Sequence, residues 1–389
     1  MEIIIASDLA PTKINSHIFQ TDDILTKMDE NFKNEWFNAD FRILNLETVL
    51  GEKENLKPIN KAGPNIIADS KCIYGIKKLN PDLVLLSNNH ILDYGEKGLN
   101  NTLKKLDENN INYTGIINSI NEEYNGYIFE MENIKFGIYN VCENEFSVAT
   151  SKSKGANPFI ESKVYLEIQK LKKTVDHLIV VFHGGKEFYR YPTPNLQRIC
   201  RCFVDFGADA VIVQHTHCIG SEEIYKDKTI LYGQGNFIFY NDEYVDDKSV
   251  LDTALLVKII IEDKKLKIKY IPIERCEGLV KISDNKSIIK EFENRSNDIK
   301  KEDFININYE EFAKEMLNTY LKVFDRRKIT NRLINKFLIN KFYEKIYKKG
   351  DYIGISNIIE CEAHRELLIT GLKGKIKELE KEKKWNIIF

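Results

Sequence analysis

Side chains that can bind metal ions follow five short apolar runs of this 389-residue sequence. Each run is rich in Ile, Val, Leu or Phe and is followed by a carboxylate, an amide or an imidazole, the groups that proteins use to bind cations. In chain order, the polar positions are Asp8, Glu47, Asn88-Asn89-His90, His183 and His215-Thr216-His217. Because α/β sheets gather their ligand sites at strand ends, we expect these side chains to converge.

These residue types predict a centre for one or two divalent or transition-metal ions, with Mn, Fe and Zn as the candidates. A His-x-His pair can direct two imidazoles at neighbouring cations, and one carboxylate can bridge two cations about 3.5–4 Å apart. Each residue alone could equally be a loop, capping or surface group. Their occurrence together after five apolar runs favours the metal centre, which takes in four of the seven histidines.

The elements that must position these groups alternate between strands and helices as far as about residue 275. Short apolar segments predict buried strands over Glu2–Ser7, Phe41–Asn45, Asp82–Ser87, Lys135–Asn140, His177–His183 and Asp209–Val213. Apolar residues at helical spacing predict helices over Asp22–Phe37, Glu96–Asn109, Ile160–Val175 and Leu196–Phe206. The alternation predicts a layered α/β domain.

The pattern changes after Ser221. Further strands are expected over Glu222–Tyr225, Thr229–Tyr232, Leu251–Ile261 and Leu266–Pro272, with a hairpin turn at Asp263-Lys264-Lys265. The polar segment Ser283–Asp303 is expected to be a linker. Helices are expected over Tyr309–Phe324, Ile329–Lys348 and Ile355–Lys383, with a break at Gly371 or Gly374. We therefore predict two domains, residues 1–280 and a helical appendage over residues 281–389.

The composition argues against a nucleic-acid-binding or membrane-spanning chain. Lys and Arg total 57 against 59 Asp and Glu, for a net charge of −2. No apolar run approaches the roughly 20 residues that span a bilayer, and the N-terminal residues lack a basic segment typical of a secretory signal. We therefore expect a cytoplasmic protein. The seven cysteines include no C-x-x-C pair and are expected to be free thiols.

Four sequence motifs match those of a known family, both in their residues and in their order along the chain. They are Asn45-Leu46-Glu47, the eight residues from Asn88 to Gly95, the run Phe206–Val213 that leads into His215-Thr216-His217, and Gly233–Phe239. Together they resemble the capsule-synthesis CapA family, also called poly-γ-glutamate synthesis proteins, of the calcineurin-like metallophosphatase superfamily. The resemblance covers roughly residues 2–275. It implies a four-layer sandwich of two mixed sheets flanked by helices.

The resemblance also implies a role for each converging residue. It assigns Asp8 and His217 to a first metal, Asn89, His183 and His215 to a second, and Glu47 to a bridging position. His90 would lie beside the attacked group as an acid or charge stabiliser. Asp93 would orient that imidazole or cap the following turn.

Three departures from the superfamily pattern weaken the expected first metal site. The first-strand Asp-x-His is replaced by Asp8-Leu9-Ala10, so one histidine ligand is missing. The Gly-His that precedes the final His-x-His is replaced by Val213-Gln214, and the Trp that usually follows the fourth-motif His is replaced by Gly184. A weakly occupied first site, or a single metal, is expected from the missing histidine.

Residues near these motifs could recognise an anionic small molecule or a polymer precursor. The candidates are Lys61, Lys186, Glu187, Arg190 and Asn236, because cationic groups beside a metal pair suit phosphate or carboxylate. Residues 326–349 form a basic amphipathic segment. It could make a weak contact with an anionic membrane surface, or it could be a docking helix with a solvated basic face.

The leading hypothesis is a metal-dependent hydrolase that uses a metal-bound hydroxide on a phosphoester or an amide, in capsule or exopolymer biosynthesis. The alternative is a non-catalytic metal-binding assembly or ligand-binding component of a polymer-synthesis complex, which the missing first-strand histidine favours. A third hypothesis is a peripheral membrane component of a polymer-synthesis complex, attached through the basic segment 326–349.

Overall fold

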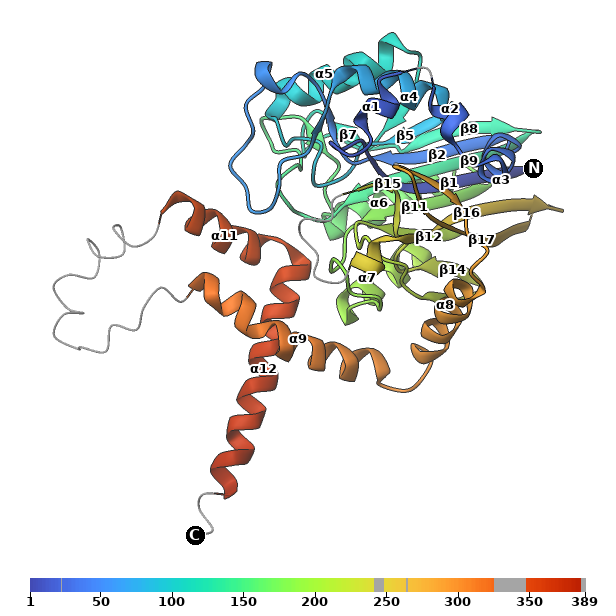
Figure 1. Cartoon of the computed structure of the whole chain (residues 1–389). Coiled ribbons are helices and arrows are strands. Elements are labelled where there is room, and N and C mark those ends of the chain that lie inside the picture. The colour runs from blue at the N-terminus through green and yellow to red at the C-terminus, as the bar shows by residue number, and fades with distance from the viewer. Residues whose placement is uncertain (22, 241–247, 264, 325–347, 386–389) are drawn as a thin grey trace. The chain divides into compact units, whose positions relative to one another are not determined.

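The computed structural model describes residues 1–21, 23–240, 248–263, 265–324 and 348–385 (Figure 1). The chain groups into two compact units. The first unit comprises Met1–Ile59 and Asn65–Glu302, and the second comprises Asn60–Pro64 and Asp303–Phe389. The domain boundary expected after residue 280 stays a prediction.

The first unit contains an eight-stranded mixed sheet in the order β18-β17-β16-β1-β2-β5-β6, with β15 also paired to β1. Its strands are β1 (Glu2–Ala10), β2 (Phe41–Leu46), β5 (Leu83–Leu85), β6 (Tyr113–Thr114), β15 (Asn236–Phe239), β16 (Thr253–Glu262), β17 (Lys265–Cys276) and β18 (Leu279–Ile282). The central strand β1 runs parallel to β2 and β15 and antiparallel to β16. The ends of β1 and β2 that carry site residues therefore lie together.

A second, six-stranded sheet has the order β13-β14-β12-β11-β9-β8. Its strands are β8 (Tyr127–Met131), β9 (Ile134–Cys142), β11 (His177–His183), β12 (Ala210–Gln214), β13 (Glu222–Tyr225) and β14 (Lys228–Leu231). The strands β9, β11 and β12 are parallel, so their carboxyl ends share one edge. This is the edge at which the sequence places three of the predicted histidines.

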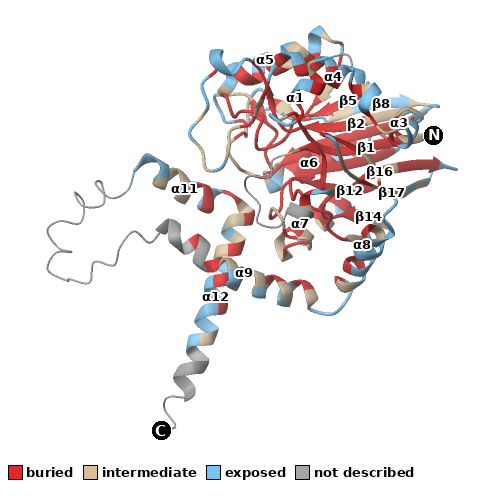
Figure 2. Ribbon diagram, viewed as in Figure 1, coloured by how far each residue is buried: buried red, intermediate tan, exposed pale blue. Residues whose placement is uncertain are grey.

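The two sheets pack face to face through alternate residues of their strands. Figure 2 shows most of these strands as buried. Ile3 and Ile5 of β1 lie in one apolar core with Ile179 and Val181 of β11. The intervening Ile4 points to the opposite face of the larger sheet, into a separate core that contains Trp36. This alternation explains why the strand sequences are almost continuously apolar, since both faces are covered.

Helices cover the outer faces of the sheets. They are α1 (Ser16–Phe19), α2 (Ile24–Lys27), α3 (Glu30–Phe37), α4 (Ile73–Lys78), α5 (Gly95–Glu108), α6 (Glu161–Lys172) and α7 (Pro194–Asp205). The helix α8 (Lys286–Asp298) instead packs Ile288 and Phe292 into the core between the sheets. Short strands β3 (Val49–Leu50) with β4 (Ile67–Ala68), and β7 (Ile116–Ile117) with β10 (Gly155–Ala156), complete the unit with the 3₁₀ turns Lys53–Asn55, Ser70–Cys72 and Lys248–Leu251. The predicted α/β sandwich of two mixed sheets flanked by helices is confirmed.

Two local predictions in this unit are wrong. The helix expected over Asp22–Phe37 is divided, because Met28 is extended and the carboxylate of Asp29 caps a new helix by accepting a hydrogen bond from the Phe32 N–H at 2.8 Å. The linker expected over Ser283–Asp303 contains α8, which begins after the capping residue Asn285 and buries Ile288 and Phe292.

The second unit contains the helices α9 (Phe304–Phe324), α11 (Lys349–Glu360) and α12 (Glu362–Trp385). The predicted break at Gly371 or Gly374 is wrong, because the helices part at Cys361, whose backbone is extended. Gly371 instead allows close packing: a Cβ there would lie 2.5 Å from the Ala313 carbonyl oxygen of α9.

No helix within the described residues is both long enough and apolar enough to cross a bilayer. The helix expected over Ile329–Lys348 and most of the basic segment 326–349 lie outside the described residues. The membrane contact and the cytoplasmic location stay predictions.

Candidate metal centre

Asp8 lies within β1 at an irregularity of the strand register. It is level with Asn45 on β2 and Asn236 on β15. Asn45 Nδ2 donates a hydrogen bond of 2.8 Å to Asp8 Oδ1, and the His215 backbone N–H donates one of 3.3 Å to Oδ2. A local bulge thus aims one fully buried carboxylate at the end of the second sheet.

Glu47 is a buried acid whose ionised form is disfavoured by its surroundings. It follows β2, its backbone N–H donates to the Leu9 carbonyl, and its side chain is fully buried. Among the described residues, neither carboxylate oxygen has a hydrogen-bond partner. Burial, and then the neighbouring charge of Asp8, raise the pKa of Glu47 to about 8. A buried carboxylate with free lone pairs fits a cation as its missing partner.

Three imidazoles from the second sheet surround this carboxylate. His183 ends β11, and its Nε2 lies 3.3 Å from Glu47 Oε1. His215 and His217 follow β12 with left-handed φ angles of 83° and 54°. Such backbone is uncommon for residues other than glycine and clusters at functional sites, so this turn is consistent with a constrained ligand-presenting loop.

The charge states suggested by burial suit metal binding. Burial lowers the pKa of His183, and burial together with the nearby His183 lowers the pKa of His215 well below its usual value. Both imidazoles are therefore neutral at pH 7 and offer a lone pair. Burial opposes the charging of His217, but Glu47 and Asp8 raise its pKa overall.

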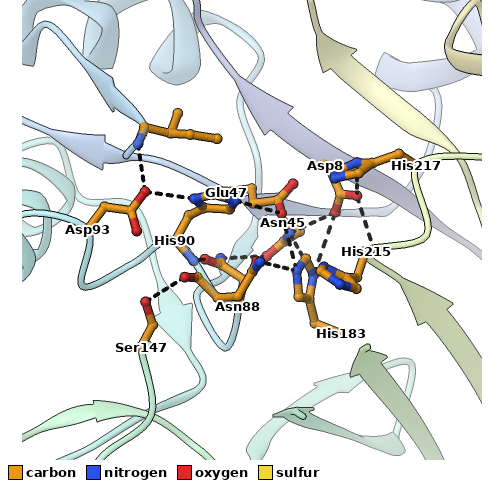
Figure 3. Close-up of polar contacts among 12 residues, drawn as sticks. Asp8, Asn45, Glu47, Asn88, His90, Asp93, Ser147, His183, His215 and His217 are labelled. Atoms are coloured by element: carbon orange, nitrogen blue, oxygen red, sulfur yellow. Dashed lines mark hydrogen bonds and ion pairs between the residues drawn. The ribbon is translucent and has the colours of Figure 1, made fainter. Parts of the chain in front are cut away.

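The potential ligand atoms form three groups, in each of which the atoms lie within 4.8 Å of one another. They are Glu47 with His183 and His215, Asp8 with Glu47 and His217, and Glu187 with His215 and His217. Figure 3 shows Asp8, Glu47, His183, His215 and His217 of these groups. Glu47 is shared by the first two groups, as a bridging ligand would be. The buried Nδ1 of His215 also has no hydrogen-bond partner among the described residues. The donor set thus fits one or two cations, and no cation is named by the geometry.

The predicted neighbours Asn89 and His90 occupy different positions. Asn89 Oδ1 lies 3.1 Å from His183 Nε2, inside the cluster. His90 Nε2 lies 4.0 Å from Glu47 Oε1, while its Nδ1 lies 2.7 Å from Asp93 Oδ2 (Figure 3). Asp93 Oδ2 also accepts a hydrogen bond from the Ile66 N–H at 2.6 Å. Asp93 therefore contacts both the imidazole and the chain, as a residue that orients His90 would.

Three residues of the site have no role assigned from the sequence. Asn45 and Asn88 link the strand ends, since Asn88 Nδ2 donates to Asn45 Oδ1 at 3.1 Å. Glu143, directly after β9, places Oε1 3.4 Å from His215 Nε2, and its Oε2 accepts a hydrogen bond from the Gly185 N–H at 3.0 Å. A carboxylate at Nε2 leaves Nδ1 of the same ring available to a cation. The signal in the sequence is a polar residue shortly after a strand, as at the other five positions.

The predicted substrate residues are less uniform. Lys186 is buried, and Glu187 belongs to one of the three ligand groups. Asn236 Oδ1 lies 2.8 Å from His217 Nδ1, so it holds that ring. Arg190 lies on the loop after β11, and Lys61 belongs to the second unit. The roles given to all these residues, and to the ligands above, stay predictions.

Comparison with known families agrees with the motifs. Residues 5–241 match the model of the bacterial capsule synthesis protein PGA_cap. The chain belongs to this PGA_cap family. The match includes every predicted ligand from Asp8 to His217 and ends before β16 and α8.

Two curated relatives of the PGA_cap chain are named for polymer synthesis. It is 27% identical over 210 residues to the capsule biosynthesis protein CapA of Bacillus anthracis, covering 52% of this chain and 51% of that protein. It is 25% identical over 206 residues to the PGA biosynthesis protein CapA of Bacillus subtilis strain 168, covering 52% and 53%. The chain thus spans about half the length of the curated relatives it matches.

Solved structures give weaker likenesses. A hypothetical protein from Thermus thermophilus aligns over 71% of this chain and 100% of that chain, with a TM-score of 0.45 and 11% identity. The sulfate thiohydrolase SoxB of the same organism, in complex with glycerol, aligns over 70% and 56%, with a TM-score of 0.40 and 9% identity.

Proposed function

We propose that this PGA_cap chain is a metal-dependent hydrolase that cleaves a phosphoester or an amide during synthesis of a capsule or related exopolymer. The observation that carries the proposal is Glu47. It is a fully buried carboxylate with no hydrogen-bond partner among the described residues, and it lies between two groups of potential ligands. Burying an ionised carboxylate without a cation would lower the free energy of unfolding, with no interaction to offset the loss.

Both sheets contribute residues to such a centre. Asp8, Glu47 and His217 would hold one ion, and Glu47, Asn89, His183 and His215 would hold a second. Divalent ions, when bound, supply Lewis-acid activation of the scissile group and of water. The neutral imidazoles and the pairing of Asn45 with Asp8 keep the ligand atoms in place before any ion arrives.

His90 is positioned to move a proton near the reacting bond. With Nδ1 donating to Asp93, its Nε2 faces the carboxylate of Glu47 at 4.0 Å. A protonated Nε2 can donate to a leaving oxygen or nitrogen, and Asp93 keeps the ring in that orientation. The polar contacts of Asp93 to both the ring and the Ile66 N–H limit rotation of this pair.

The substrate in this proposal is an anionic polymer precursor. The buried ammonium of Lys186 lies on the loop that follows His183, and its charge contributes to the low pKa of His215. A cation there favours substrates that carry phosphate or carboxylate. The names of the curated relatives, which refer to capsule and PGA biosynthesis, favour the same class.

The test is hydrolysis by the full chain after chelation and reconstitution with Mn, Fe or Zn. A generic phosphodiester and a γ-glutamyl anilide report the two bond types. We expect metal-dependent turnover of at least one, lost in Glu47→Gln and kept in Glu130→Gln, whose side chain is exposed on β8. Absence of both metal uptake and turnover in the reconstituted wild-type chain would refute the proposal.

A specific observation favours a second candidate, a non-catalytic ligand-binding component. Ala10 occupies the place of the histidine expected on the first strand, and it packs in an apolar cluster with Ile66 and Phe239. The first site therefore gains no ligand from this position. Tight stoichiometric metal with no turnover of either substrate would support this candidate over the hydrolase.

A further inference from the structure

Arg295 on α8 is a buried cation without a close counter-ion among the described residues. Its exposed fraction is 8%, and its Nε donates a hydrogen bond of 2.9 Å to the Gly220 carbonyl oxygen. Its ion pair within the described part of the chain is with Glu291, at 3.8 Å from Nη1, and the Glu291 side chain is 60% exposed. Such a carboxylate neutralises a buried charge poorly, because solvent competes for it.

A second arginine approaches the same place. Arg190, which is half-buried, makes no hydrogen bond or ion pair with any described residue. The adjacent Tyr191 hydroxyl donates a hydrogen bond of 3.1 Å to Asp298 Oδ2. Asp298 is three residues after Arg295 and so shares its face of the helix. This hydrogen bond fastens the loop of Arg190 to the part of α8 that carries Arg295.

The electrostatics agree with this proximity. Burial lowers the pKa of Arg295, and the charge of Arg190 lowers it further. The charges of Arg190 and Arg295 both act on the buried Cys218 side chain, directly after His217. The two guanidinium groups therefore lie near the same buried position.

Both arginines are tied to the turn that carries the predicted ligands. Gly220, which accepts from Arg295, is three residues after His217. On the Arg190 loop, the Phe188 N–H donates a hydrogen bond of 2.8 Å to the Thr216 carbonyl, and the Phe188 ring stacks on His217 with 5.8 Å between centroids. Arg295 and the loop of Arg190 thus both contact the segment from Thr216 to Gly220, which contains His217.

We propose that Arg190 and Arg295 form an anion-binding subsite that holds a phosphate or carboxylate group of the substrate beside the metal centre. Two guanidinium groups with unused donors match the geometry of either oxyanion, and an anion would neutralise the buried pair. The inference rests on the proposed function only in naming the bound anion as part of the substrate. Since α8 lies beyond the residues that match the family model, half of this subsite is supplied by a segment that the family model does not describe.

The subsite favours a substrate with more than one anionic group. One group would lie between the arginines while the scissile bond lies at the ligand cluster. A polymer precursor with repeated anionic units has this property, whereas a small neutral ester does not. The same chemistry could come from a phosphate or from a carboxylate, and the probes below separate the two.

The test measures anion binding by the metal-free full chain with isothermal titration calorimetry. The probes are inorganic phosphate and a γ-linked glutamate dipeptide. The variants are Arg190→Gln, Arg295→Gln and the control Arg198→Gln, which pairs with Glu161 on the surface. We expect one site per chain in the wild type and in the control. Arg190→Gln should weaken the preferred probe by about 10- to 100-fold, the effect of losing one charged hydrogen-bond donor.

The outcomes keep this inference separate from the proposed function. Equal binding by the wild type and Arg190→Gln, or no binding of either probe by the wild type, would overturn the subsite even if hydrolysis is found. Arginine-dependent binding in a chain that takes up no metal and hydrolyses neither test substrate would support the subsite and refute the enzyme. Arg190 is half-buried, so its variant remains informative should Arg295→Gln fail to fold.

Discussion

Replacing Glu47 by glutamine should stabilise the metal-free protein at alkaline pH. The folded carboxyl has a pKa of about 8, against 4.5 for an ordinary glutamate, because it is buried beside Asp8. The unfolded chain therefore loses this proton near pH 4.5, whereas the folded chain keeps it until about pH 8. Between these values the folded state binds more protons, so the free energy of unfolding falls as the pH rises.

The size of this effect follows from the two pKa values. At about 1.4 kcal/mol for each unit, their separation gives an upper limit of about 5 kcal/mol above pH 8. Water that enters an ion-free site would reduce this, and we expect about 2–4 kcal/mol. Glu47→Gln imitates the protonated acid at every pH. It should therefore exceed the wild type in stability at about pH 8.5 and match it near pH 4.5.

Urea unfolding of chelator-treated protein between about pH 4.5 and 9 measures the difference directly. Glu167→Gln is the matched control, since Glu167 is also buried but its carboxylate accepts hydrogen bonds from the Tyr139 hydroxyl at 2.5 Å and the Tyr124 N–H at 2.9 Å. That variant should be less stable than the wild type. Adding metal should reverse the order at position 47, because only the carboxylate gains a cation. A wild-type-to-Gln difference that does not change with pH would refute the reasoning.

Three further predictions concern the remaining side chains of the centre. His90→Ala should keep its metal while kcat falls by about 10²–10⁴-fold, and Asp93→Asn should show a milder fall; loss of metal from His90→Ala would make it a ligand instead. Glu143→Ala should weaken metal binding by about 10–100-fold in a chelator competition, because the His215 imidazole loses its orienting carboxylate. The circular-dichroism spectrum should not change, and an unchanged metal affinity would show that the contact is incidental. By elemental analysis, His183→Ala should lose more metal than Asp8→Ala, since His183 contacts both Glu47 and Asn89; equal losses would contradict this.

The five positions that carry the potential metal ligands can be found in the sequence because each follows a short apolar run. The run predicts a buried strand, and the topology of parallel strands then brings the ends together. Glu143 also follows directly after a buried strand, but the sequence alone does not identify it. The strand is expected to end at Asn140, whereas it continues to Cys142. The contact between the buried Glu143 carboxylate and the His215 imidazole depends on tertiary packing, which the local sequence does not predict.

Two of the three errors in the helices, those at α8 and α12, have a similar cause. The segment of α8 is mostly polar, and its apolar face is short, so composition alone resembles a linker. It forms a helix because Ile288 and Phe292 find a core formed by distant strands. In α12, glycine is expected to end the helix, but Gly371 lies within it, and the close approach of α9 leaves no room for a side chain at this position.

The left-handed backbone at His215 and His217 has an evolutionary consequence. Imidazoles occupy two positions where glycine or asparagine would be conformationally easier, and position 47 carries a buried acid where glutamine would be easier. If these residues bind a cation as proposed, a descendant that no longer bound it would be free to replace all three. Relatives with glycine or asparagine at these two turn positions and glutamine at the buried acid would therefore mark lineages in which the fold has survived the loss of its chemistry.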